Sequence, residues 1–569
     1  MVLEGGQTPE VNFVWEHNRR LLLDYLDALE GEKTIVWDRS VMQRANLFAG
    51  PSVLKEHGVI HNLALNQFRL PETPYALFFL APTLTALDGL REYIDKMKPE
   101  KKTLFEVLFI PEMWYVVREK LKDLGGGKYW ERLESVRELP LTWLPRDGDV
   151  LSLSDRELTS RLLINGDWTH LHRCAVAINQ LMALCSETIP LYSRGKWAHD
   201  IARMVRKMGS TDEVQEPLSP ALRLNRLVII DRWIDPLTPF LHQLTYAGIL
   251  DELYGISMVG SIKVSLAEFE NDDGIDPKEL KEIHLNDEVY HRLKHIHINA
   301  IGYELAKILS EIKEDEQFDR DRMSVAEYQV LVKKMPKILQ RKKFCGVHMR
   351  LAEMARTHLY EVFGDYIRVE KELLESADND KVHPFIEEYI ITGDDAYVAL
   401  RLIIVHSLTA NGLKPGILQQ YRRMITQSFG VETLNKLLKL QKMGVIRERG
   451  GTGKLAAEYA PPMFPQMKKQ YDLLPENISE TNTQDAAYAY SGYAPLIVRI
   501  LEEGDRVKWT GWNKTFEESA RGDDRTAVFV VGGATRSELA CINLMPNVCL
   551  VSTSSIITGN RFLDNITQI

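Results

Sequence analysis

The chain has 569 residues, which is too long for a single hydrophobic core and predicts two to four domains. Hydrophobic residues make up 45% and charged residues 26%, the composition of an ordinary soluble globular protein. A formal net charge of -10 over this length argues against a general nucleic-acid binder, which would carry a basic surface.

Targeting and metal-binding patterns are also missing from the sequence. Residues 1–10 lack the basic run and apolar core of a signal peptide. The longest apolar run, residues 75–82, is strand-length and far short of the roughly 18 residues that a membrane span needs. The five cysteines are an odd number and scattered, which suits reduced thiols in the cytoplasm, and no C-x-x-C or H-E-x-x-H pattern indicates a metal site.

The first part of the chain alternates strand and helix patterns. An amphipathic helix is predicted over residues 11–29, and apolar strands are predicted over 34–37, 76–80 and 104–110. Helical patterns over 86–97 and 113–124 follow the second and third of these strands. Such alternation is typical of a small parallel α/β domain, which we expect to span residues 1–142.

A second α/β domain begins at residue 143 and is predicted to be interrupted. Helices over 169–184 and 198–208 precede a buried strand over 227–230, and its first part is expected to end at residue 256. The remaining strands come much later, over 526–531 and 548–552, within a completing part that we place at 486–569. The middle of the chain is therefore predicted to be an insertion, divided into helical domains over 257–376 and 377–485.

Charged residues follow the central strand at its carboxyl end, where open α/β sheets bind ligands. Asp231, Asp235 and His242 could therefore serve an α/β phosphotransfer or hydrolase-type enzyme. The spacing favours a different role, because a phosphotransferase needs its second carboxylate two residues after the first, whereas here it comes four residues later. Pro236 and Pro239 also stiffen the turn. We interpret Asp231, Arg232 and Asp235 as buried pairs and caps that fix the turn from strand to helix, with the enzyme as the alternative.

Two glycine-rich runs resemble phosphate-binding loops without completing the pattern. Gly532-Gly533 with Thr535 lacks the G-x-G-x-x-G spacing, which favours a tight turn followed by a helix cap. The run from Gly450 to Lys454 has Leu455 where a P-loop needs Ser or Thr for Mg²⁺, so a linker is predicted. We expect no cofactor.

The insertion is predicted to be mostly helical. Helices are expected through residues 287–313, and Ser324 to Glu327 match a capping box that opens a further helix. Pro336 is predicted to interrupt this helix, with another over 338–360, so that two helices meet at the proline and form a projecting hairpin. Apolar residues beyond the packing needs of such a hairpin can receive another helix, although an ordinary helix pair fits the same pattern. Helices over 396–407 and 421–445 follow, and residues 447–485 are predicted to be loop and linker.

The central run also carries a recognisable motif, D-R-x-x-D-x-x-T-P over 231–239, followed by Q-L-T-Y over 243–246 and D-E-L-Y-G over 251–255. With the segments 35–38, 54–57, 147–152, 166–167, 189–190 and 490–496, this motif resembles the Sec-1/Munc-18 (SM) family of membrane-fusion proteins over essentially the whole chain. The signature residues of the motif are Asp231, Arg232, Asp235, Thr238, Pro239, Tyr246, Gly248 and Asp251.

The resemblance implies the SM-protein arch, an α/β fold of two parallel-sheet domains plus a large, mainly helical insertion domain. It also implies a protein without enzymatic activity that binds SNARE proteins. A rigid arm that holds SNARE helices in register would lower the entropic barrier to their assembly without bond chemistry. By this likeness the arm is the domain over 257–376, called domain 3a, and its SNARE-contact candidates are Met335, Pro336, Ile338, Leu339 and Lys342.

Several of the quoted segments resemble one branch of the family, whose members are subunits of the HOPS/class C tethering complex. This implies docking of vacuolar protein sorting-associated protein 16 on domain 3b, residues 377–485, for which Arg422, Val431 and Leu434 are candidates. It also implies a cytoplasmic protein, peripheral on late endosomes, lysosomes or the vacuole, that meets the membrane through partners and binds no nucleic acid. A scaffold that binds tether subunits without any SNARE contact is a third possibility.

Overall fold

The structure is a computed structural model in which the chain forms two compact units, residues 7–146 and 147–569. It describes residues 7–69, 73–97, 103–185, 187–209, 221–272, 274–316, 325–376, 379–450, 462–476, 478–480, 483–490, 492–517 and 524–567. The run 451–454 and Ser324, which entered the linker and capping predictions, lie outside these residues.

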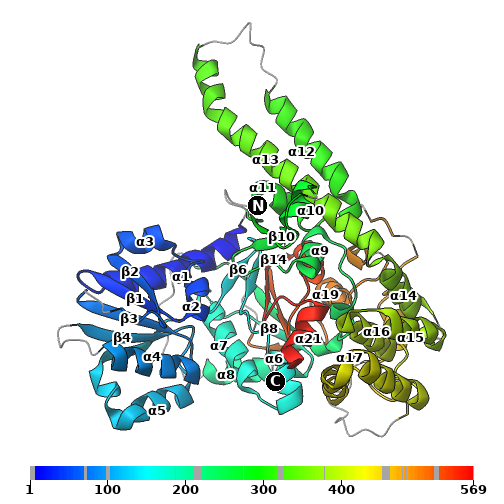
Figure 1. Cartoon of the computed structure of the whole chain (residues 1–569), viewed down its shortest axis with the longest axis horizontal. Helices are drawn as coiled ribbons and strands as arrows, with labels where there is room; N and C mark the ends of the chain where they lie inside the picture. Colours follow the sequence, from blue (N-terminus) through cyan, green and yellow to red (C-terminus); the bar gives the residue numbers. More distant parts are fainter. Residues whose placement is uncertain are drawn as a thin grey trace. The chain divides into compact units, whose positions relative to one another are not determined.

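The first unit is a parallel α/β domain, as the sequence predicts. Its five strands lie in the order β2-β1-β3-β4-β5 and all neighbours are parallel. The strands are β1 (Lys33–Trp37), β2 (Val59–Ala64), β3 (Tyr75–Leu80), β4 (Leu104–Phe109) and β5 (Leu133–Glu138). The helices are α1 (Pro9–Asp27), α2 (Arg39–Ala45), α3 (Pro51–Glu56), α4 (Leu84–Met97) and α5 (Tyr115–Asp123) (Figure 1).

The sheet of the second unit joins strands from distant parts of the chain. Its strands lie in the order β12-β8-β9-β13-β14-β7-β6. The edge strand β6 (Leu144–Arg146) comes just before the boundary at residue 146. The other strands are β7 (Val150–Ser152), β8 (Leu191–Arg194), β9 (Arg226–Asp231), β12 (Asn513–Thr515), β13 (Thr526–Val531) and β14 (Val548–Thr553). Strand β9 pairs in parallel with β13, with Asp231 opposite Val531. This pairing confirms the predicted insertion, because the two central strands lie on either side of it in the sequence.

Helices of the second unit flank these strands in the sequence. They are α6 (Leu158–Ser160), α7 (Thr169–Ala183), α8 (Lys196–Met208), α9 (Tyr246–Leu253), α19 (Leu496–Arg506), α20 (Arg536–Asn543) and α21 (Gly559–Thr567). Thr535 and Glu538 form a complete capping box at the start of α20. The predicted tight turn and helix cap after Gly532-Gly533 are therefore confirmed, and both glycines have positive φ, at 95° and 99°.

The insertion begins with a small β-ribbon and continues as helices. Strands β10 (Ser261–Ser265) and β11 (Leu280–His284) pair antiparallel, with α10 (Leu266–Glu270) between them. The next helices are α11 (Glu288–Leu293), α12 (Ile301–Glu316), α13 (Val325–Glu361), α14 (Gly364–Glu375), α15 (His383–Thr392), α16 (Ala396–Thr409), α17 (Pro415–Met443) and α18 (Phe464–Gln470). Helix α18 lies within the stretch predicted to be loop and linker, so that part of the prediction is wrong.

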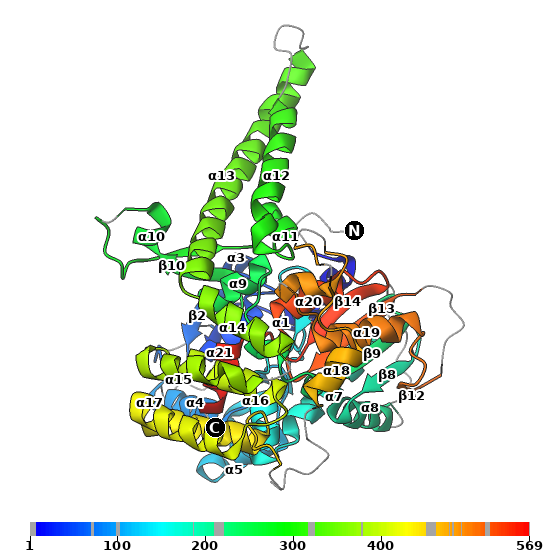
Figure 2. The same ribbon diagram turned by 90° about the vertical axis from the view of Figure 1, so that its right-hand side faces the viewer.

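The helical hairpin exists, but its two helices are not those predicted. Helices α12 and α13 run side by side away from the rest of the second unit (Figures 1 and 2). Pro336 lies inside the single 37-residue helix α13 and does not end it. The prediction of an interruption at Met335-Pro336 is therefore wrong. A proline removes one backbone N–H donor and disfavours a helical conformation in the residue before it. In this 37-residue helix the hydrogen bonds and packing of the other turns outweigh that local cost.

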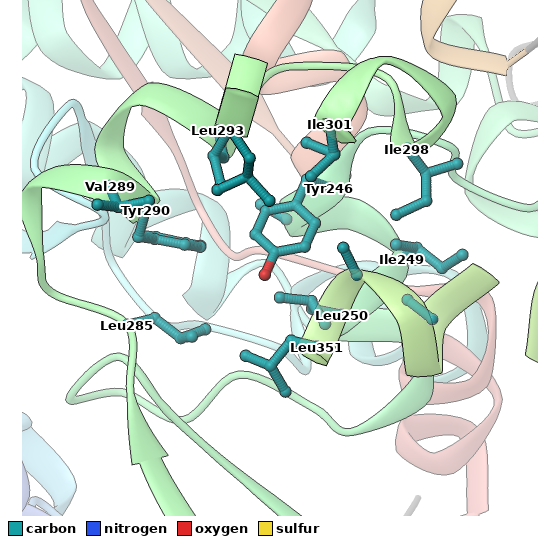
Figure 3. Packing of buried hydrophobic residues seen from close by; sticks show 14 of the residues in the cluster. Tyr246, Ile249, Leu250, Leu285, Val289, Tyr290, Leu293, Ile298, Ile301 and Leu351 are labelled. Atoms are coloured by element: carbon teal, nitrogen blue, oxygen red, sulfur yellow. The ribbon is translucent and has the colours of Figure 1, made fainter. Parts of the chain in front are cut away.

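A buried apolar cluster anchors the hairpin to the second unit. Figure 3 shows Tyr246 and Leu250 of α9 packing with Tyr290 and Leu293 of α11, and with Leu351 of α13. Ile338 belongs to the same cluster, and Met335 and Phe344 pack against it. The side chains of α13 between Met335 and Leu359 that face inward are thus part of a hydrophobic core.

Candidate functional site

The signature residues at the carboxyl end of β9 form a buried polar network. The guanidinium of Arg232, 1% exposed, donates from Nη1 to both carboxylate oxygens of Glu538 at 2.7 Å. Its Nη2 lies 3.3 Å from Oδ2 of Asp235. Glu538 is the residue that also completes the cap of α20, so one arginine ties the end of β9 to the helix that follows β13.

Both aspartates of the motif have their oxygens occupied by donors of the chain. Asp231 accepts from the backbone N–H groups of Trp197 (2.9 Å) and Trp233 (2.8 Å). Asp235 accepts from the hydroxyl of Thr238 at 2.6 Å and from the backbone N–H of Leu496 at 3.0 Å. Pro239 occupies the short 3-10 turn Thr238–Phe240. The predicted role of these residues as buried pairs and caps is what the geometry shows.

Burial dominates the electrostatics of Asp231. Desolvation raises its pKa to about 7, and the two backbone N–H donors, together with Arg232, offset only part of that effect. Gly195 approaches this carboxylate closely, since a Cβ on Gly195 would lie 2.2 Å from the Cβ of Asp231, and Gly195 has a φ of 97°. The chain encloses this carboxylate, and Asp231 is only 2% exposed.

The remaining signature residues join α9 to its neighbours. Asp251 accepts from Arg561 Nη2 at 2.7 Å and lies 3.1 Å from Arg536 Nε. The hydroxyl of Tyr246 lies 2.9 Å from Nδ1 of His348 on α13. Gly248 allows α9 to pack closely, because an added Cβ would lie 2.7 Å from Ser537 Oγ.

The residues of the alternative active site are held by different partners. His242 Nδ1 lies 2.7 Å from Glu370 Oε1 on α14, while Asp231 and Asp235 are engaged as described above. No nucleophile and base pair emerges from these contacts. Among the described residues there is also no group of three or more His, Cys, Asp or Glu side chains that could hold a metal ion.

The SNARE-contact candidates divide by exposure. Leu339 is 58% exposed, and Lys342 and Pro336 are exposed as well. Met335 is half-buried against the core, and Ile338 is only 4% exposed within it. Ile338 is therefore a packing residue of the arm, and its inclusion among surface contacts does not fit its burial. Neighbouring positions on a helix point in different directions, and the sequence alone did not show which of these two faced the core.

A groove at the base of the hairpin was not predicted. It has a volume of about 530 Å³ and runs between α12 and α13, lined mainly by Ile301, Leu305, Met349, Ala352 and Tyr360. Met349 is 50% and Tyr360 60% exposed. The sequence does contain a signal, because Met349, Ala352, Arg356 and Tyr360 recur at intervals of three and four residues and form one stripe of α13.

The candidates for docking a partner subunit lie on α17, which bends at Gly430. Val431 is 63% exposed and Leu434 is half-buried. Arg422 donates from Nη2 to Oε1 of Gln441 at 2.8 Å, and this hydrogen bond joins the two parts of α17 on either side of the bend. Leu438, seven residues after Val431, is 44% exposed and extends the apolar stripe.

A second hollow, of about 660 Å³, lies in the first unit at the carboxyl ends of β1, β2 and β3. It is lined by Asp38, Ser40, Asn66 and Thr83 among others. This is the position where the strand order changes direction around β1, the usual ligand crevice of an open sheet. The Asp38 carboxylate already accepts from Ser40 and Ala81 backbone N–H groups, at 3.0 and 3.3 Å, and so shapes the loop.

Solved structures with this fold are of SM proteins. The SM protein Vps45 in complex with the Qa SNARE Tlg2 aligns with a TM-score of 0.63 at 17% identity, covering 98% of both chains. The Unc18–syntaxin 1 complex from Monosiga brevicollis aligns with a TM-score of 0.63 at 14% identity, covering 97% of this chain and 99% of that one. The fold is therefore that of the SM proteins, as predicted.

The family follows from the sequence comparison. The Sec1 family model matches residues 33–565, and the chain belongs to the Sec1 family. It is 54% identical to vacuolar protein sorting-associated protein 33A of Caenorhabditis elegans, over 100% of this chain and 98% of that protein. It is 29% identical to the protein of the same name from Rattus norvegicus, over 98% of each. The resemblance to this branch of the family is confirmed.

Proposed function

We propose that this protein binds SNARE helices on its α12–α13 hairpin and holds them in register during membrane fusion. The observation that carries the proposal is the apolar groove between the two helices, with Met349 and Tyr360 half or more exposed beside it. A groove of this kind accepts the apolar face of an amphipathic helix. The structural neighbours support the choice of partner, since one is the SM protein Vps45 in complex with a Qa SNARE and another is an Unc18–syntaxin 1 complex.

The proposed role requires no chemical step. Helices must lose orientational and conformational freedom before their heptads pack, and a preformed groove removes part of that cost in advance. We assign the protein no catalytic residue, because the polar residues of the alternative active site serve as caps and ion pairs. Among the described residues no helix has the length and apolar character to cross a membrane. Contact with late endosomal, lysosomal or vacuolar membranes would come through partners.

The experiment is a pull-down of purified late-endosomal SNARE motifs with the full chain. We expect Leu339→Asp, Met349→Asp and Tyr360→Asp together to abolish capture, with the melting temperature unchanged because all three side chains are exposed. Leu280→Asp, on β11 and 60% exposed, is the matched control and should bind like the unmodified protein. Equal capture by the triple variant and the control would reject the hairpin as the binding site.

We further propose that α17 docks a tether subunit of the type of vacuolar protein sorting-associated protein 16, as part of a HOPS/class C complex. The exposed pair Val431 and Leu438 supplies the apolar centre that such an interface needs. Val431→Asp with Leu438→Asp should abolish co-purification with that subunit while leaving SNARE capture intact. Loss of SNARE capture in this variant would mean that the two surfaces are not separate.

A further inference from the structure

The two-stranded ribbon of β10 and β11 takes no part in the proposed function. It belongs to the second unit, and Figure 2 shows it projecting with α10 to one side of the base of the hairpin. Its inner face is part of the core, through Ile262, Val264 and Ile283. Each of its two strands also has an outer edge, whose backbone N–H and C=O groups need partners.

The pairing of the two strands shows which backbone groups of β11 point outward. Leu285 donates to the carbonyl of Gly260 at 2.8 Å, which fixes the phase of the antiparallel ladder. Along such a ladder, positions that bond to the neighbouring strand alternate with positions that do not. Leu280, Glu282 and His284 are the positions that do not, so their N–H and C=O groups point away from β10.

This outer edge of β11 is open. The N–H and C=O groups of Leu280, Glu282 and His284 have no hydrogen-bond partner among the residues that the structure describes. Their side chains are exposed as well, that of Leu280 to 60%. The edge of β10 differs, because Ser261 accepts from the N–H of Ser257 at 2.8 Å and donates to its hydroxyl at 3.0 Å. An open edge with an exposed apolar side chain is a template for another strand.

The charge of the ribbon favours a basic strand. From the start of β10 to the end of β11, the sequence has seven acidic residues and three lysines. On the exposed face Lys263 lies opposite Glu282, but the Glu282 carboxylate accepts from the Ser261 hydroxyl at 2.7 Å and forms no ion pair among the described residues. Lys281, on the other face, pairs with Glu270 at 2.5 Å. Glu282 is therefore an exposed negative charge in the middle of the open edge.

We propose that β11 binds an extended, basic segment of a partner protein as a third strand of the ribbon. The added strand runs antiparallel to β11, the more stable arrangement per residue. Side chains directly opposite each other on neighbouring strands interact, so the segment carries arginine or lysine opposite Glu282 and an apolar residue opposite Leu280. Backbone hydrogen bonds supply the affinity and these two pairs supply the preference. The partner is bound as a strand, whereas the hairpin groove binds helices.

The first test uses the full chain and the heptapeptide TVTRTVT, acetylated and amidated at its ends. With its arginine opposite Glu282, its valines lie opposite Leu280 and His284. We expect the peptide to slow hydrogen exchange at the backbone amides of these three residues, with saturable dependence on its concentration.

Two methylated forms of the peptide test the backbone bonds. In the proposed register, the backbone nitrogens of the valines and the arginine face β11, and those of the two inner threonines face away. Methylation of the first set should abolish the slowing of exchange, whereas methylation of the second set should preserve it. No slowing with the unmodified peptide, or the same exchange with both methylated forms, would overturn the proposal.

The second test reverses the charge at the middle of the edge. Glu282→Lys should weaken binding of TVTRTVT about three- to tenfold and tighten binding of the TVTETVT peptide by a similar factor. Glu279→Lys makes the same change at an exposed position on the opposite face of the ribbon, so it is the matched control and should keep the preference for the arginine peptide. Equal effects of the two variants would show general attraction to an acidic surface and would contradict the assigned pairing.

Discussion

At the scale of single residues, the signature motif is a set of satisfied polar groups in a closed interior. Arg232 neutralises Glu538 and lies beside Asp235, and each of these carboxylates also caps a turn or helix. A buried ion pair of this kind adds little to the free energy of unfolding compared with an apolar replacement of the same size. Removing one partner, however, leaves the other as an unpaired buried charge, which is strongly destabilising. The sequence motif therefore specifies how the chain turns at the sheet edge.

This interpretation predicts the effect of Asp235→Asn. The amide retains one acceptor but places a donor where Thr238, Leu496 and Arg232 already point donors. We expect the free energy of unfolding to fall by about 1–3 kcal/mol, measured by urea denaturation. Asp365→Asn, at an exposed position on α14, is the control and should change stability by less than about 0.5 kcal/mol. Unchanged stability of Asp235→Asn would argue against the structural role.

Asp149 predicts a dependence on pH. Burial acts to raise its pKa, but the charges and hydrogen bonds of Lys294 and His295, each 2.6 Å away, outweigh burial and lower it below the usual range. A depressed pKa in the folded state means that Asp149 contributes stability above its unfolded pKa of about 4, and that this contribution is lost as pH falls further. Between pH 6 and pH 2, the unfolding free energy of Asp149→Asn should fall less steeply than that of the unmodified protein. Parallel curves would contradict this.

At the scale of elements, close packing of α9 against α20 depends on one glycine. A methyl group at Gly248 would lie 2.7 Å from both Ser537 Oγ and Thr245 Oγ1, inside the hydrogen bond that joins these hydroxyls. Gly248→Ala should therefore destabilise the protein by about 1–3 kcal/mol, although alanine is the better helix former. The same change at Gly302 of α12, where an added Cβ meets nothing within 4 Å, should be neutral or stabilising. Thermal unfolding of the two variants is the measurement. A lower melting temperature for Gly248→Ala alone shows that close packing, and not helix propensity, decides the effect at that position.

Pro336 gives a second prediction for an element. It is exposed and lies within α13, where it removes one backbone hydrogen bond. Pro336→Ala restores the donor, so amide hydrogen exchange in the turn around residues 332–340 should slow at least severalfold. Exchange in α17, which is not altered, serves as the internal reference. Faster exchange around residue 336 would show that the proline stabilises its turn.

The same elements show how far the sequence could predict the fold. Strands buried on both faces, such as β3, β9 and β13, have continuous apolar runs and were predicted. Strand β2 was missed because it lies at the edge of its sheet and exposes Ile60 and Asn62. Pro336 was interpreted from local preference alone, whereas packing of α13 on α12 and on the core decides the outcome.

The candidate site was predictable only in part. The likeness to the family placed it on the insertion, but the sequence could not show that Ile338 faces the core while Leu339 faces outward. The groove needs residues of α12 and α13 that are far apart in the sequence, such as Leu305 and Met349, which are 44 positions apart, and such pairing follows only from the fold. The contact of His242 with Glu370 could not be predicted from the sequence, because the two residues are 128 positions apart.

At the scale of the whole molecule, contacts between distant segments are concentrated around α20 and α9. Arg536 contacts Asp147 and Asp251, and Arg561 contacts Asp251 from the last helix of the chain. Removing α21 by ending the chain after residue 556 would leave Asp251 without Arg561, and would remove the buried side chain of Leu563 from the core. We expect the shortened protein to fail to unfold cooperatively in a urea titration, while a chain ending at 567 behaves normally.

The pairing of β9 with β13 also bears on how the chain is made. The ribosome delivers β9 about 300 residues before the strand that covers its edge. At a synthesis rate of about 5–20 residues per second, the edge of β9 that pairs with β13 stays unpaired, and its apolar side chains stay exposed, for about 15–60 s. During this time a strand with unpaired backbone groups is a template for wrong pairing. Synthesis of this protein in the cell should therefore depend on chaperones that shield nascent β-structure, even though the folded molecule buries residues 227–231 of that strand.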